Sequence, residues 1–179
     1  MFSYEVMLLW TGDPITAKNT HWLVSLLVIG NALNGLMNLP YGLQLAYGWT
    51  KLAFYTNVVA VFLLVPMLIV MVHYYDAIGA AIVWVTLNTG YVLISLQIMH
   101  HRLLKGEQWR WYREDVGLPL AAALVTAGLG RWLLPMDISV SITVAYIAAV
   151  SVVTLIVTAL VTPYVRGWLR RYSYGWPVT

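Results

Sequence analysis

The stretch that decides the fold is Gly30 to Lys51, GNALNGLMNLPYGLQLAYGWTK. It lies in an apolar segment long enough to cross a bilayer, yet it contains three asparagines, a glutamine, four glycines and a proline. On an ideal helix with about 100° per residue, Asn31, Asn34 and Asn38 fall within about 60° of one another. Amides in hydrocarbon are costly unless they face protein or a water-filled cavity. We therefore expect this face of the helix to contact protein or to line a water-filled cavity.

Neutral hydrogen-bonding groups continue this face and recur in the following segments. They can donate and accept without fixing a charge, which suits a polyhydroxylated substrate such as a sugar. Pro40 adds a predicted helix kink, and interrupted helices often mark transport pathways. The alternative is that the amides only pack neighbouring helices, which is the more common role of a single buried asparagine. The candidate substrate-pathway residues are Asn31, Asn34, Asn38, Tyr41, Gln44, Asn57 and Asn88.

The composition of the whole chain places it in a membrane. Of its 179 residues, 61% are hydrophobic and only 9% are charged, whereas soluble domains are about a quarter charged. The absence of cysteine excludes disulfides and thiolate metal sites. A net charge of +3 does not indicate nucleic acid as a partner, because basic residues of membrane proteins mostly report topology.

Hydropathy along the chain predicts an all-α integral membrane protein with about five transmembrane helices. An apolar helical stub at 1–10 and a polar loop at 11–21 come before them. Each predicted span is near the roughly 20 residues that a membrane helix needs. The spans are 22–47, 52–72, 77–99, 117–135 and 138–163. Between the third and the fourth lies HHRLLKGEQWRWYREDV (100–116), which is charged and aromatic, so we expect an interfacial helix or loop there.

Lysine and arginine are distributed unequally between the two sides of the predicted bundle. One side holds only Lys18 and Arg131. The other side holds Lys51, Arg102, Lys105, Arg110, Arg113, Arg166, Arg170 and Arg171. The positive-inside rule makes the second side cytoplasmic and places the C-terminus there. Arg131 is expected to snorkel to the interface, with an anion contact at the outer mouth as the alternative.

The sequence contains no pattern that favours an enzyme or a metal site. Apart from Glu5 in the stub, the carboxylates fall in loops or at span ends, whereas a proton-relay carboxylate would lie within a span. His100 and His101 are adjacent, so on a helix they point about 100° apart and chelate poorly. Phosphate-binding and hydrolase motifs are absent. We therefore expect no catalytic residue, no metal and no cofactor.

Four segments resemble one family of bacterial transporters. They are MLLWTGDP (7–14), GNALNGLMNLPYGLQLAYGWTKLAFYTN (30–57), IGAAIVWVTLNTGYVL (78–93) and MHHRLLKGEQWRWYREDVGLPL (99–120). Together they resemble the C-terminal half of polysaccharide-biosynthesis flippases of the O-antigen type. These belong to the multidrug/oligosaccharidyl-lipid/polysaccharide export superfamily. The likeness covers about residues 5–135, is specific at 30–57 and 99–113, and is generic in the last span.

The resemblance implies a two-lobe transporter of 12 to 14 helices in the bacterial inner membrane. Such proteins move an undecaprenyl-pyrophosphate-linked oligosaccharide across that membrane for polysaccharide or O-antigen biosynthesis, as in lipopolysaccharide. In that frame, residues 1–105 correspond to part of the C-lobe and the start of the interfacial segment. Residues 106–116 correspond to the interfacial connector, and 117–179 to an appended hairpin with a cytoplasmic tail.

The resemblance also implies the partners. They are membrane lipid, the lipid-linked oligosaccharide, and either an N-terminal lobe that these residues lack or polysaccharide assembly proteins. Residues 1–10 read as the last turns of a helix whose beginning is missing, and a short interfacial segment of a complete small protein is the alternative. The alternative function is a non-transporting truncated product or a small scaffold subunit of a polysaccharide assembly complex.

Overall fold

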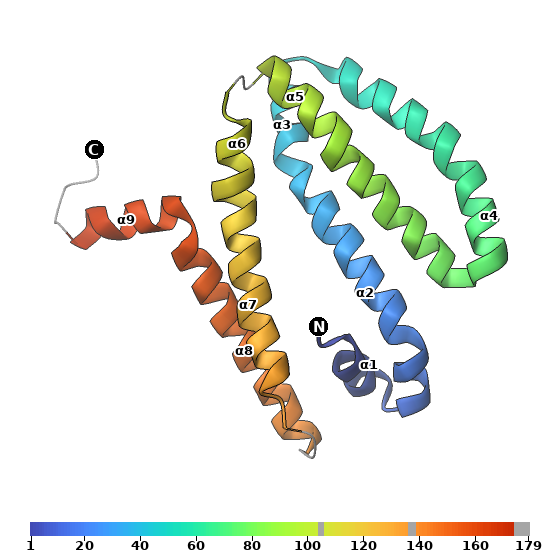
Figure 1. The fold of residues 1–179 in the computed structure, drawn as a ribbon, viewed down its shortest axis with the longest axis vertical. Helices are drawn as coiled ribbons and strands as arrows, with labels where there is room; N and C mark the ends of the chain where they lie inside the picture. Colours follow the sequence, from blue (N-terminus) through green and yellow to red (C-terminus); the bar gives the residue numbers. More distant parts are fainter. Residues whose placement is uncertain (104–105, 136–138, 174–179) are drawn as a thin grey trace. The chain divides into compact units, whose positions relative to one another are not determined.

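The computed structural model describes residues 1–103, 106–135 and 139–173. Every element within these ranges is helical, which confirms the all-α class (Figure 1). The elements are α1 (Ser3–Thr11), α2 (Pro14–Leu36), α3 (Asn38–Ala46), α4 (Thr50–Gly90), η1 (Tyr91–Ser95), α5 (Leu96–Leu103), α6 (Gln108–Arg110), η2 (Trp111–Gly117), α7 (Leu118–Trp132), α8 (Val140–Val161) and α9 (Pro163–Ser173). The segments η1 and η2 are π-helical. Lys105 of the expected connector, Asp137 before the last expected span and tail residues 174–179 lie outside the described residues.

The chain forms two compact units, and three helical runs among the described residues are long and apolar enough to cross a membrane. One unit comprises residues 10–106, and the other combines residues 1–9 with 107–179. The three runs are Pro14–Ala46, Thr50–Arg102 and Val140–Val161. Their apolar side chains are largely exposed, and that of Phe62 is 77% exposed. Such surfaces are expected where the surrounding solvent is lipid.

The first long helix begins eight residues earlier than the sequence analysis expected. Residues 14–21 are the first two turns of α2 and not part of a polar loop. Asp13 caps this helix: its carboxylate accepts hydrogen bonds from the backbone N–H groups of Ile15 and Thr16, both at 3.1 Å. Pro14 stands at the first helical position, where its missing N–H costs nothing. The hydroxyl of Thr16, followed by these two N–H groups, holds the pKa of the Asp13 carboxyl below its usual range.

The break between α2 and α3 lies at Met37, three residues before the predicted kink at Pro40. Proline has no backbone N–H, so the carbonyl of Leu36 loses its partner four residues on. The helix tightens there, and the N–H of Met37 bonds the carbonyl of Asn34 at 2.9 Å. The regular pattern resumes when the N–H of Tyr41 bonds the carbonyl of Met37, also at 2.9 Å. Pro40 therefore breaks the regular hydrogen bonding of the helix in the turn that precedes it.

The run from Thr50 to Arg102 is a hairpin of two antiparallel legs. Its 53 residues would form about 80 Å of straight helix, far more than the ~30 Å of bilayer hydrocarbon. The chain reverses at Asp76, whose φ of 49° and ψ of −136° are not helical. Gly79 is required beside this turn, because a Cβ there would lie 2.1 Å from the carbonyl oxygen of Met71. We call residues 50–75 the first leg and residues 77–103 the second leg; Figure 1 shows the first leg in turquoise and the second in green to yellow-green.

The second unit is built on α7 and α8. Gly130 of α7 lets the two helices approach closely, because a Cβ there would meet Val150 of α8 at 2.6 Å. The Tyr146 hydroxyl donates to the carbonyl oxygen of Gly130 at 2.7 Å. From Gln108 on, the expected connector is helical and continues through α6 and η2 into α7. The guanidinium of Arg131 pairs with the carboxylate of Glu5 in α1, and its expected position at the membrane interface stays a prediction.

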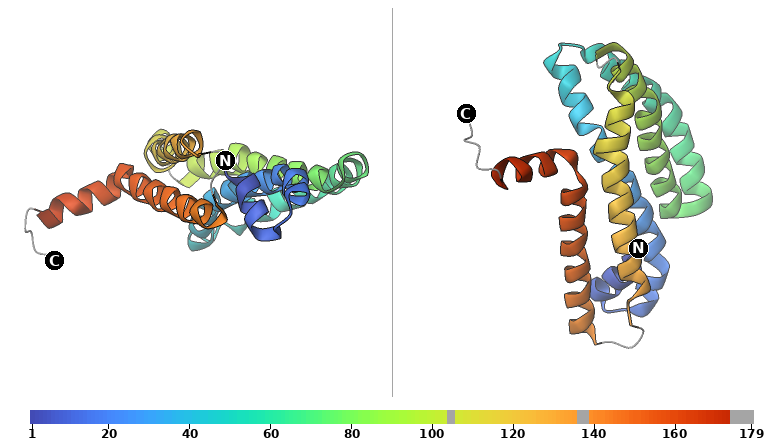
Figure 2. Two further views of the ribbon diagram at one scale, coloured as in Figure 1. Left: turned by 90° about the horizontal axis from the view of Figure 1, so that it is seen from below. Right: turned by 60° about the vertical axis from the view of Figure 1, so that its left-hand side comes forward.

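The segment after the last long helix, for which the sequence analysis predicted only a cytoplasmic tail, is helical over Pro163–Ser173. At Thr162 the backbone is extended, and α9 starts at Pro163. Both views in Figure 2 show α9 turning away from the axis of α8. Arg166 stabilises this bend, because its Nε donates to the free carbonyl of Leu160 at 2.8 Å. The chain therefore leaves its last long helix through a capped bend.

Candidate functional site

Four polar side chains join α2 to the second leg of the hairpin. The Nδ2 of Asn34 donates to the Oδ1 of Asn88 at 2.9 Å, and the Nδ2 of Asn88 donates to the carbonyl oxygen of Trp84 at 2.8 Å. The Nε1 of Trp84 donates in turn to the Oδ1 of Asn31 at 3.2 Å. Asn88 is fully buried. We call Asn31, Asn34, Trp84 and Asn88 the amide seam, and its geometry is that of helix packing.

The amide seam depends on a small residue at the point of closest approach. A Cβ on Gly30 would lie 2.4 Å from Cδ1 of the Trp84 ring, so only glycine admits the indole at its present position. Ala81, three residues before Trp84 on the same helical face, is also buried. Sequence reasoning did not identify Trp84. Its spacing from Asn88, four residues on the same helical face, is the pattern that indicates it.

The remaining predicted pathway residues have different surroundings. Asn57 of the first leg accepts a hydrogen bond at 2.7 Å from the hydroxyl of Tyr91, which joins the two legs. Gln44 is 2% exposed, and its Oε1 has no hydrogen-bond partner among the described residues. Asn38 is exposed at the start of α3, and Tyr41 is 48% exposed one turn later. The seven residues therefore do not form one continuous face.

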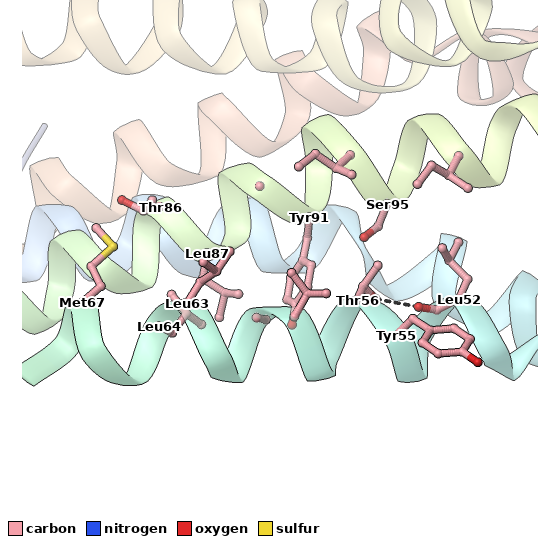
Figure 3. A pocket seen from close by; sticks show the side chains of 15 residues that line it. Leu52, Tyr55, Thr56, Leu63, Leu64, Met67, Thr86, Leu87, Tyr91 and Ser95 are labelled. Carbon is pink, nitrogen blue, oxygen red and sulfur yellow. Dashed lines mark hydrogen bonds between the residues drawn. The ribbon is translucent and has the colours of Figure 1, made fainter.

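An apolar groove runs between the two legs of the hairpin (Figure 3). It encloses about 610 Å³. Figure 3 shows Met67 and Thr86 toward one end and Leu52 with Tyr55 toward the other. Its walls include Leu52, Val59, Leu64, Leu87, Ile94 and Ile98. Few polar atoms are available to a ligand inside, and the hydroxyl of Thr56 bonds the backbone carbonyl of Leu52 at 2.8 Å.

The end of the groove next to Leu52 is basic. The Arg102 guanidinium carbon lies 4.3 Å from the ring centroid of Trp49, a cation–π contact that joins the ends of the two legs. Lys51 is exposed beside Leu52. The sequence has no aspartate or glutamate in 14–75 or 77–106, so nothing within the hairpin neutralises these cations locally. The acidic residue of the hairpin, Asp76, lies at the opposite turn.

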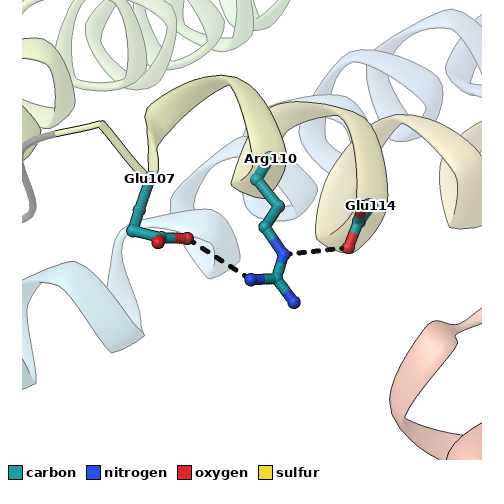
Figure 4. A network of polar contacts seen from close by, with 3 residues as sticks. All are labelled: Glu107, Arg110 and Glu114. Atoms are coloured by element: carbon teal, nitrogen blue, oxygen red, sulfur yellow. Dashed lines mark hydrogen bonds and ion pairs between the residues drawn. The ribbon is translucent and has the colours of Figure 1, made fainter.

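The connector carries a small exposed network of charges (Figure 4). The Arg110 guanidinium lies 3.2 Å from the carboxylate of Glu114 and 3.8 Å from that of Glu107. The hydrogen bond to Glu114, with the attraction of both carboxylates, raises the pKa of Arg110. These groups are spaced by one helical turn and face solvent, so they form ordinary surface pairs. Among the described residues no three potential metal ligands come together.

No protein-family model, no curated protein and no solved structure matches the chain. The functional argument therefore rests on the residues and their geometry.

Proposed function

We propose that the chain is part of a lipid-linked oligosaccharide flippase of the bacterial inner membrane. The observation that supports this most is the exposed polar surface of α3 formed by Asn38 and Tyr41. It lies in a run otherwise apolar enough to cross a membrane. An exposed amide there avoids contact with hydrocarbon only if the surface borders protein or water. An amide and a phenol on a wet surface suit the hydroxyl groups of a glycan.

The proposed arrangement has five membrane crossings. The hairpin supplies two, because its legs run antiparallel on either side of Asp76. The run from Pro14 to Ala46 supplies one, and α8 supplies another. The fifth is the helix that reaches from the connector through η2 to the end of α7. The bias of lysine and arginine then puts the connector and α9 in the cytoplasm.

The amide seam reduces the set of residues that are proposed to line the pathway. Asn34 and Asn88 bond each other, and Asn31 is bonded by Trp84, so these amides are occupied in holding helices together. Asn38 and Tyr41 are exposed and lie beyond the helix break at Met37. In this proposal the residues before the break hold α2 in place, and those after it face the substrate. The opposite wall of the pathway is supplied by other helices of the transporter.

The amide seam also supports a second candidate function, a scaffold subunit of a polysaccharide assembly complex. Four of the seven candidate amides and hydroxyls make hydrogen bonds between helices, and these need no substrate to explain them. They are Asn31, Asn34, Asn57 and Asn88. A scaffold requires a stable helical unit in the membrane but no wet surface on α3.

A complementation experiment separates the two candidates. The gene is inactivated in the host cell, and export of lipid-linked oligosaccharide to the outer leaflet is measured with the wild-type gene or variants supplied in trans. We expect Asn38→Leu with Tyr41→Leu to lower export at least tenfold at unchanged protein level, because hydrogen bonds to the glycan are lost. The exposed-site control is Phe62→Leu, which should export normally. Normal export by the double variant favours the scaffold, and normal export without the gene contradicts both.

A further inference from the structure

The groove between the two hairpin legs has the dimensions of a site for one lipid chain. Its first-leg wall extends from Leu52 to Met67, which is about 22 Å along a helix. One leaflet of a bilayer contributes about 15 Å of hydrocarbon, half of the usual thickness. The groove therefore reaches from one interface past the midplane. Its volume of about 610 Å³ is within the range of sites that enclose a single small ligand.

Charge distinguishes the two ends of this groove. At the end near Leu52, Lys51 precedes that wall residue in the chain and is exposed, and Arg102 is one helical turn beyond the wall residue Ile98. Trp49 stands at the same end, and tryptophan favours the headgroup layer. Asp76 is at the other end of the legs. A ligand that follows the groove would thus have its apolar part inside and an anionic group at the basic end.

We propose that this groove binds one acyl chain of an anionic glycerophospholipid, with the phosphate between Lys51 and Arg102. Apolar walls hold the chain without hydrogen bonds, and the two cations select a net negative headgroup over a zwitterionic one. The proposal does not depend on a flippase function, because the groove and its basic end belong to the hairpin itself.

Two other occupants fit the groove less well. A long polyprenyl chain needs more space than about 610 Å³, so most of it would lie outside. A helix from a second copy of the chain would bury the apolar walls, but it would gain nothing from two unneutralised cations at one end. A phospholipid uses both the walls and the charges.

A substitution at Gly90 tests whether the groove binds an acyl chain. Gly90 lines the groove, and a Cβ added there meets no atom within 4 Å. Gly90→Leu should therefore fold normally and fill the groove. The matched control is Gly35→Leu on α2, an exposed helical glycine that likewise has no atom within 4 Å of an added Cβ but lies outside the groove.

The measurement is phospholipid retained per protein after purification of the full chain in mild detergent, with helix content followed by circular dichroism. We expect wild-type protein and Gly35→Leu to retain about one phospholipid. Gly90→Leu should retain roughly tenfold less, because its side chain displaces at least two methylene groups. Equal retention by Gly90→Leu and wild type, with native helix content in both, would overturn the proposed groove site.

Headgroup selection is tested on delipidated protein by adding phosphatidylglycerol or phosphatidylcholine with identical acyl chains. Wild type should bind phosphatidylglycerol roughly thirtyfold more tightly, because two cations attract its net negative headgroup, whereas the choline ammonium offsets the phosphate charge of phosphatidylcholine. Lys51→Gln with Arg102→Gln should bind both lipids equally. Equal binding by wild type would overturn the choice of an anionic lipid. Tighter binding of undecaprenyl phosphate, or a dimer that excludes added lipid, would also contradict the proposal.

Discussion

The second leg of the hairpin has two sides that contact their neighbours in opposite ways. Toward α2 it presents the amide seam, where glycine admits an indole ring and each amide has a partner. Toward the first leg it presents an open groove with large apolar walls, crossed by the hydrogen bond from Tyr91 to Asn57. One helix is therefore fixed on one side and loosely contacted on the other.

The difference shows how helices associate where burial of apolar surface gives little advantage. In lipid, an apolar side chain loses nothing by exposure, so contact needs small residues, close approach and hydrogen bonds. The amide seam has all three, whereas the groove has large side chains and one hydrogen bond between side chains across it. This predicts that substitutions in the amide seam alter stability, and that substitutions in the groove alter ligand binding.

The largest expected effect comes from filling the amide seam. Gly30→Leu forces the Trp84 indole away and removes its hydrogen bond to Asn31, so the free energy of unfolding should fall by about 3 kcal/mol. Gly90→Leu, in the groove, should change it by less than about 0.5 kcal/mol. Unfolding in SDS, followed by circular dichroism, gives both values. Equal losses would remove the distinction between the two sides.

The next largest effect is the coupling between Asn34 and Asn88. In a double-mutant cycle with leucine at each position, the coupling free energy should be about 1 kcal/mol, since the bond joins two helices away from water. The same SDS titration measures it. A coupling near zero would mean that the two amides do not act together.

A smaller loss is expected for the hydrogen bond that crosses the groove. Tyr91→Phe removes the hydroxyl that bonds Asn57 and should lower the free energy of unfolding by about 0.5 kcal/mol. Asn57→Leu should cost nothing further in the Tyr91→Phe background. A loss comparable to that of Gly30→Leu would show that the two legs are held as firmly as the amide seam.

The smallest effect concerns pH and the first turn of α2. The Asp13 carboxylate has a depressed pKa, so its contribution to stability is complete above the usual value of 3.8 and is lost as the pH falls through the lower folded value. The melting temperature of Asp13→Asn should therefore depend less on pH below 3.8 than that of wild type. Identical pH profiles of the two proteins would show that the Asp13 cap does not stabilise α2.

Local sequence patterns identified the helical class, the two legs of the hairpin and the polar stretch that starts at Gly30. They also contained the start of α2, because Asp13 before Pro14 is a helix-start signature, but the polar residues that follow were read as a loop. The amphipathic α9 was missed for a similar reason, since its charges were counted only for topology.

Other features depend on contacts between distant residues, which no local pattern contains. Arg131 pairs with Glu5 from the opposite end of the chain. Asn31 and Asn38 share a face on an ideal helix, but the break at Met37 separates them and leaves only Asn31 against the second leg. The groove likewise exists only because Asp76 turns the chain back.

Cysteine labelling tests the central claim, that the α3 surface is wet while the amide seam is dry. The natural chain has no cysteine, so single substitutions can be read without background. In intact membranes, Asn38→Cys should react rapidly with a water-soluble maleimide, because only a hydrated thiol forms thiolate. Ala81→Cys, buried on the face of the amide seam, and Phe62→Cys, on the exposed apolar surface, should react slowly. Labelling of Asn38→Cys no faster than of Phe62→Cys would contradict the account.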